Sequence, residues 1–94
     1  MRVLFRPEAR IVLDEIGDFI DSINLDGSGA FWTQKFITYL YSYALPNVKY
    51  ALCHNAELAA RGFSCLNYND WIIAFTIEGE NFTVHKIVRG NILQ

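Results

Sequence analysis

Apolar residues recur at steps of three and four along the first quarter of the chain. The set comprises Ala9, Val12, Leu13, Ile16, Phe19, Ile20 and Ile23. This spacing places all of them on one face of an α-helix. Pro7 suits the first turn of a helix, and Glu8 favours that turn through the helix dipole. We therefore expect a helix to begin here, after a short β-prone run at residues 2–5.

A second helical period follows, with Trp32, Phe36, Tyr39, Leu40 and Tyr43 on one face. The connection at residues 25–29 carries two glycines and a candidate cap in Ser28. The run 45–47 contains a proline and ends the helix. A connection this short predicts an antiparallel helical hairpin. Two amphipathic helices of this width need a sheet to bury their apolar faces.

The second half of the chain supplies that sheet. Strands are predicted at residues 62–68, 71–77 and 82–88, with turns at Asn69-Asp70 and at residues 78–81. The middle run is apolar on both faces, which is typical of a central strand. His85 and Lys86 are neighbours on the last strand, so we expect them to face opposite sides. Residues 48–61 have the weakest secondary-structure pattern. Within them, one or two helical turns are expected at residues 55–60.

The expected architecture is α+β, in the order β-αα-βββ, as one domain over residues 1–94. The helical hairpin packs on one face of a small antiparallel-type sheet.

Composition excludes several classes of protein. The 94 residues are 52% hydrophobic and 15% aromatic, which excludes disorder. No apolar run approaches the ~20 residues that span a bilayer, and the N-terminal apolar stretch is too short for a signal peptide. A net charge of −2, with neither half basic, argues against an extended nucleic-acid-binding surface.

The cysteine and histidine content predicts neither a metal site nor a disulfide framework. The spacings among Cys53, His54, Cys65 and His85 do not fit the usual zinc patterns. No phosphate-cradling or nucleotide-binding motif is present, so no cofactor is expected. Two cysteines suggest a reducing cytoplasm as the location, with Cys65 as a small buried hydrophobe.

The first helix resembles that of the RelE/ParE toxin superfamily. Its opening PEA (residues 7–9) is followed by the clusters LDEI (13–16) and DFI (18–20). The closing runs IIAFTI (72–77) and VHKIVRG (84–90) are similar to the last two strands of the ParE branch. The resemblance covers nearly the whole chain in order and spacing, and it implies a RelE/ParE-like fold.

The resemblance also implies the toxin of a type II toxin–antitoxin pair, neutralised by its cognate antitoxin. The ParE branch is associated with DNA gyrase, and the RelE branch with cleavage of mRNA on the ribosome. The ribonuclease branch uses Lys and Arg on the sheet and an acid–base residue in the tail. Here residues 63–66 and 72–73 carry no cation, and residues 91–94 contain no Tyr, His or Arg. Whether the protein is an enzyme stays open, and these absences favour binding without chemistry.

Three basic residues, Arg61, Lys86 and Arg89, are the expected contacts to the macromolecular target. The first alternative is a ribosome-dependent ribonuclease with an atypical catalytic site built from Arg61, His85 and Arg89. Attack by a 2′-hydroxyl needs a base, an acid and cations, so this site requires the three to converge on one concave face. The second alternative is a degenerate, non-toxic family member that acts only as a protein-binding module.

Two further surfaces bear on partners. Phe31 and Tyr41 point away from the apolar stripe of the second helix, and an exposed aromatic set would mark a partner or homodimer surface. The acidic arc of the first helix consists of Asp14, Glu15, Asp18 and Asp21, and it is interpreted as a solvated face. No membrane partner is expected.

Overall fold

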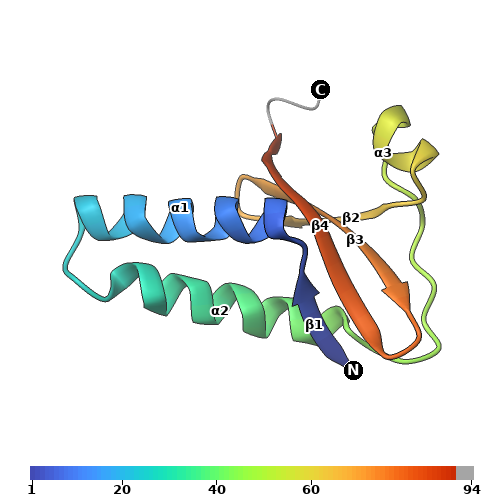
Figure 1. Ribbon diagram of the computed structural model, residues 1–94, viewed down its shortest axis with the longest axis horizontal. Helices are drawn as coiled ribbons and strands as arrows, with labels where there is room; N and C mark the ends of the chain where they lie inside the picture. Colours follow the sequence, from blue (N-terminus) through green and yellow to red (C-terminus); the bar gives the residue numbers. More distant parts are fainter. Residues whose placement is uncertain (91–94) are drawn as a thin grey trace.

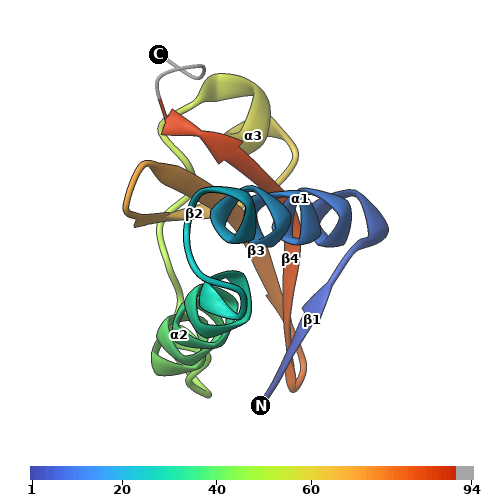
Figure 2. The same ribbon diagram turned by 90° about the vertical axis from the view of Figure 1, so that its left-hand side faces the viewer.

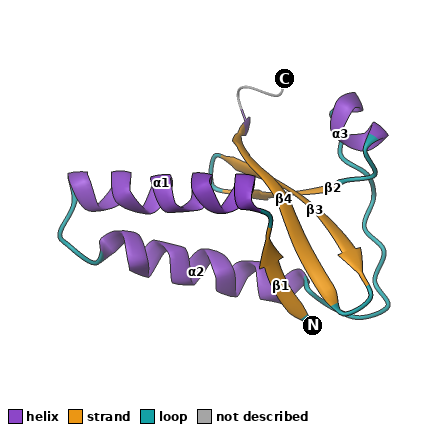
Figure 3. Cartoon of the chain, viewed as in Figure 1, coloured by secondary structure: helices purple, strands orange, loops and turns teal. Residues whose placement is uncertain are grey.

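The computed structural model describes residues 1–90, and the expectations about the tail at 91–94 lie outside the described residues. The elements are β1 (Arg2–Phe5), α1 (Pro7–Ile23), α2 (Ser28–Tyr43), α3 (Ala56–Ala60), β2 (Ser64–Tyr68), β3 (Trp71–Glu78) and β4 (Asn81–Arg89). Figure 1 shows the hairpin of α1 and α2 on one side of the sheet and α3 beyond its other side. The two long helices precede the three consecutive strands in the chain, and Figure 3 distinguishes the helices (purple) from the strands of the sheet (orange). The α+β class and the helical hairpin are confirmed.

The four strands form one sheet in the order β1-β4-β3-β2. β3 pairs antiparallel with both neighbours, which confirms it as a central strand. β1 pairs parallel with β4, so the sheet is mixed and the expected antiparallel-type sheet is wrong at this edge. Parallel pairing needs a long crossover, and the whole of residues 6–80 provides it. β1 is a four-residue edge strand, and its short pattern does not indicate its direction.

The main core lies between the hairpin and the sheet. α1 contributes Leu13 and Ile16, which are buried against the inner face of β3 and β4. The other large buried side chains of this core are Phe36, Leu40, Ile73, Phe75, Phe82, Val84 and Ile87. Aromatic rings pack between α2 and the sheet: Tyr68 of β2 contacts Trp32, Phe36 and Tyr39 of α2. Most of the aromatic residues therefore serve packing.

The hairpin extends past the end of the sheet, and its outer part is uncovered (Figure 1). Phe19 and Ile23 belong to the apolar stripe of α1, yet each is 63% exposed. Both lie on the flank of the stripe, in one row with the exposed Ile11 and Glu15, whereas Ile20 between them still packs against the main core. Amphipathic spacing identifies the inward face of a helix, but the packing of the neighbouring elements decides how much of that face is buried.

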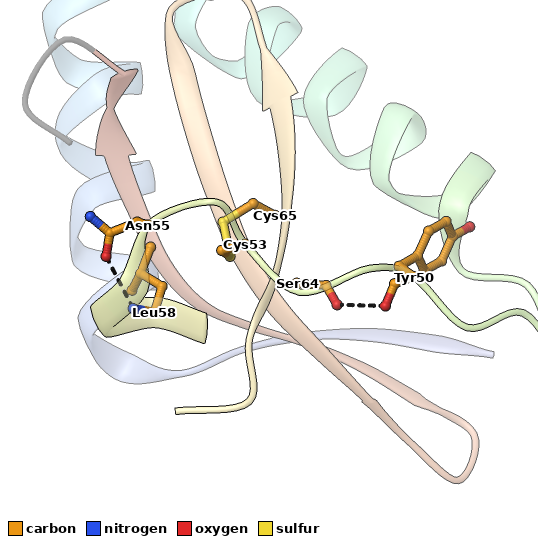
Figure 4. The surroundings of a disulfide bond; sticks show 6 residues. All are labelled: Tyr50, Cys53, Asn55, Leu58, Ser64 and Cys65. Atoms are coloured by element: carbon orange, nitrogen blue, oxygen red, sulfur yellow. Dashed lines mark hydrogen bonds between the residues drawn. A yellow bond between two sulfur atoms is a disulfide. The ribbon is translucent and has the colours of Figure 1, made fainter. Parts of the chain in front are cut away.

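A disulfide bond joins Cys53 and Cys65. It fastens the segment before α3 to β2, on the sheet face opposite the hairpin (Figure 4). The interpretation of Cys65 as a small buried hydrophobe is wrong, because the residue is half-buried and bonded to Cys53, and the argument from cysteine content to a reducing compartment loses its basis. The segment is held further by the backbone N–H of Cys53, which donates to the Phe63 carbonyl at 2.9 Å.

The helix α3 is a single short turn capped by Asn55, whose side chain accepts from the Leu58 N–H at 3.1 Å. Leu58 and Phe63 are buried with Ala74 in a second, smaller core on this face. Among residues 1–90, no helix combines the length and apolarity required to cross a membrane.

Candidate functional site

A hollow of about 670 Å³ opens on the sheet face opposite the hairpin, near the β1 edge. We call it the cationic hollow. Its lining comprises Leu4, Phe5, Arg6, Glu8, Arg61, Phe63, Glu78, Thr83, His85 and Lys86. Three of these ten residues are Lys or Arg and two are Glu, so positive charge is in excess here although the chain carries −2 overall.

An irregularity in β4 places His85 and Lys86 together in the hollow. Val84 pairs with Phe75 and Lys86 pairs with Ala74, which leaves His85 as an extra residue in a β-bulge. Val84 and the residue three positions later, Ile87, both face the core, so the two residues between them both point to the other face. The expectation that His85 and Lys86 face opposite sides is therefore wrong.

His85 is held by contacts on two sides. Its Nε2 shares a hydrogen bond with Thr76 Oγ1 at 2.8 Å, and its ring stacks on Phe63 with centroids 4.5 Å apart. Burial lowers the pKa of His85 below its usual value, Arg6 and Arg61 lower this pKa further, and Glu78 opposes them. The imidazole is therefore neutral at pH 7 and can donate or accept one proton within reach of cations.

The cations reach the hollow from three separate parts of the chain. Arg6 follows β1, where its N–H donates to the Val84 carbonyl at 2.9 Å. Arg61 ends α3 and places its guanidinium 5.1 Å from the centre of the Phe63 ring. Lys86 forms an ion pair with Glu8 at 3.3 Å. Arg6 and Arg61 are exposed, so they are available to an anionic ligand.

Arg89 lies elsewhere. It pairs in register with Trp71, and its guanidinium sits 5.2 Å from the centre of the Trp71 ring, with the side chains that face the hairpin. Of the three predicted target contacts, Arg61 and Lys86 share the hollow and Arg89 does not. The alternative catalytic set is divided in the same way: Arg61 and His85 converge, and Arg89 lies on the other face.

Arg6 is the member of this site that sequence reasoning misses. In the sequence it is only the residue before Pro7, where the first strand ends. The parallel pairing of β1 with β4 brings it beside His85, and no local pattern reports that pairing. The bulge does leave a signal, because Val84 and Ile87 are apolar residues three apart in a strand, where alternation requires an even step.

Other predicted surfaces are separated in the structure. Phe31 lines a depression with Lys35, Tyr39 and Tyr68, whereas Tyr41 lies in the groove between α1 and α2. Both are exposed, but they do not form one aromatic set. Burial, together with Tyr43 nearby, raises the pKa of Tyr39 to about 12, so this phenol stays protonated while it donates to the Asn67 carbonyl at 2.7 Å.

No cluster of three or more His, Cys, Asp or Glu side chains suited to a metal ion occurs within residues 1–90. The two cysteines are bonded to each other and so are not metal ligands in this state. Comparison with known proteins finds no family model and no curated protein that matches the sequence.

Proposed function

We propose that the protein is a growth-inhibiting toxin of the RelE/ParE type, which binds a macromolecular target and is neutralised by a cognate antitoxin. By analogy with the ParE branch, the proposed target is DNA gyrase and the proposed place of action is the cytoplasm. The element order, a strand and a helical hairpin before three consecutive strands, supports the resemblance in the sequence. The cationic hollow supports a binding role.

The observation that carries the proposal is the convergence of Arg6, Arg61 and Lys86 on one open sheet face. Cations from three chain segments form a localised positive surface on an otherwise acidic protein. Such a surface favours an acidic or phosphate-bearing partner through Coulomb attraction and charge-assisted hydrogen bonds.

A ribonuclease is the second candidate, and one observation favours it. His85, neutral at pH 7, lies in the same hollow as Arg61, so a general base and a cation are present together. Arg89 takes no part in this arrangement. Arg6 would stand in its place as the second cation for the charge that develops on the phosphate.

Tightly induced expression tests the proposal, with DNA and protein synthesis followed by labelled precursors. We expect growth to stop and DNA synthesis to fall first. Arg61→Gln should relieve the inhibition, because loss of one charge-assisted contact weakens binding about tenfold. Lys35→Gln removes the same charge from the outer face of α2 and should leave inhibition intact.

Other outcomes assign the function differently. An early stop in protein synthesis that is lost in His85→Gln would support the ribonuclease. Normal growth with abundant soluble protein would contradict both toxin functions and leave a non-toxic binding module.

A further inference from the structure

We propose that the outer end of the helical hairpin is a docking surface for a partner segment that combines apolar and basic side chains. The surface, which we call the apolar tip, consists of Phe19, Ile23 and Leu25. It lies at the opposite end of the molecule from the cationic hollow, and the inference does not rest on the proposed function. Figure 2 looks onto this end of the hairpin.

The apolar tip exposes large side chains that the fold itself does not use. Phe19 and Ile23 are each 63% exposed, and Leu25 is 85% exposed. Phe19 and Ile23 are one helical turn apart, so they form a continuous row on α1. They lie on the flank of α1, in one row with Ile11 and Glu15 and beside the stripe that is buried at Leu13 and Ile16. Exposed apolar rows of this kind mark interaction sites in soluble proteins.

The backbone beneath the apolar tip is fixed. Gly29 is buried against Gly17, where a Cβ atom would overlap the Gly17 carbonyl oxygen. The N–H of Gly29 also donates to Asp21 Oδ1 at 2.8 Å, which ties the start of α2 to α1. The two helices therefore hold the tip in one geometry, and a partner does not need to order it on binding.

Charge decides which partner fits. Asp14, Asp18 and Asp21 line the groove between α1 and α2, where Asp14 pairs with Arg10 and Asp21 accepts from the Gly29 N–H, so the carboxylates beside the apolar tip are those of Glu15 and Asp26. Glu15 lies one turn before Phe19 on the same row, and Asp26 follows Leu25 directly. An apolar surface edged by carboxylates complements apolar residues flanked by Lys or Arg.

The same charges argue against two other occupants. A symmetric contact between two copies of the chain would bring the Glu15 and Asp26 carboxylates of both copies together, and like charges repel. An anionic lipid surface would be repelled for the same reason. A basic amphipathic helix lying along the α1 row satisfies both the apolar and the charged part of the surface.

Binding of model peptides tests this inference. The probe is a fluorescein-labelled helical peptide of Leu and Lys, about 14 residues or four turns long, and its matched control is the Leu and Glu peptide. Fluorescence anisotropy should show that the Leu–Lys peptide binds more tightly, with affinity that falls as salt is added. The double variant Phe19→Ser/Ile23→Ser should weaken binding by about tenfold or more.

Two further variants make the result specific. Leu52→Ser changes an exposed apolar residue in the segment before the disulfide, away from α1, and should leave the affinity unchanged. Glu15→Gln/Asp26→Asn keeps the apolar row and should reduce the salt dependence. Circular dichroism verifies that each variant is folded, which we expect because all the replaced side chains are exposed.

Three results would overturn the inference. The first is equal affinity for the two peptides, and the second is binding that survives the Phe19→Ser/Ile23→Ser change. The third is a dimer in sedimentation velocity that this double variant dissociates, which would assign the apolar tip to a second copy of the chain.

Discussion

His85 is the residue whose environment differs most from what its neighbours in sequence suggest. The bulge turns it to the same face as Lys86, and Phe63 and Thr76 then fix the imidazole ring. Its pKa is lowered mainly by burial, and the positive charges nearby act in the same direction. A side chain in this position responds to pH through folding as well as through binding.

Acidification is expected to destabilise the protein through His85. Its pKa is lower in the folded state than the usual 6.5, so the unfolded chain takes up the proton more readily. The contribution to the free energy of unfolding is therefore complete above pH 6.5 and is lost as the pH falls through the folded pKa. Urea unfolding from about pH 5 to about pH 7.5, the range in which histidine side chains titrate, measures this fall.

The slope should flatten in His85→Gln, which cannot titrate. His54→Gln is the matched control, because it replaces the other histidine of the chain, which is exposed. An identical pH dependence in the wild-type protein and in His85→Gln would contradict the prediction.

At the scale of elements, the helical hairpin depends on a close approach and on an unusual cap. Gly27 occupies the N-cap position of α2 with φ +93°, and Ser28 is the first helical residue and not the cap. The cap is supplied from α1 by Asp21, which accepts from the Gly29 N–H. One member of the acidic arc therefore has a structural role in joining the helices.

Removal of that cap should cost stability. Asp21→Ala leaves a partly buried N–H without its acceptor, and we expect a loss of about 1–2 kcal/mol in the free energy of unfolding. Asp18→Ala is the control, since Asp18 is an exposed residue of the same arc. Chemical denaturation of both variants measures the difference, and equal midpoints would contradict this role of Asp21.

Two glycines lie where α1 and α2 touch, and substitution by alanine should affect stability differently at each. Gly29→Ala would force a Cβ against the Gly17 carbonyl oxygen, and we expect a loss of about 1–3 kcal/mol from overpacking. Gly17→Ala meets only Thr33 Oγ1 at 3.6 Å and Gly29 O at 3.9 Å, so it should be neutral or gain up to about 1 kcal/mol from helix propensity. Thermal unfolding of the two variants measures these changes in stability. A Gly29→Ala variant as stable as the wild-type protein would contradict the prediction, because it would show that the helices can move apart without loss of stability.

At the scale of the whole molecule, the Cys53–Cys65 bond fastens the segment with α3 to the sheet (Figure 4). The closed loop contains Arg61, so the bond also limits where this cation of the hollow can lie. Loop-closure entropy for a sequence separation of 12 predicts a stabilisation of about 3 kcal/mol.

Oxidised protein should therefore unfold at higher urea concentration than the same protein after reduction. Cys53→Ser/Cys65→Ser should match the reduced protein and should not respond to reductant. Alkylation of free thiols before unfolding, followed by mass spectrometry, measures the bond directly. Two reactive thiols in the native oxidised preparation would contradict it.

Local pattern is sufficient for most of the fold. Periods of three to four residues locate α1 and α2, and the β-prone runs on either side of the Asn69-Asp70 turn locate β2 and β3. These features depend on neighbouring residues, so the sequence reports them directly. In the candidate site, the sequence identifies Arg61, His85 and Lys86 as candidate residues. It does not indicate how they are arranged in space.

The arrangement itself depends on contacts between distant segments. Only the tertiary structure decides that β1 runs parallel to β4, which carries Arg6 to His85, and that Arg89 lies on the other face. Only the packing around α1 decides that Ile16 and Ile20 are covered whereas Phe19 and Ile23 are exposed. The sequence by itself determined which segments are helices and strands, because that choice is local, whereas pairing and burial depend on partners far along the chain.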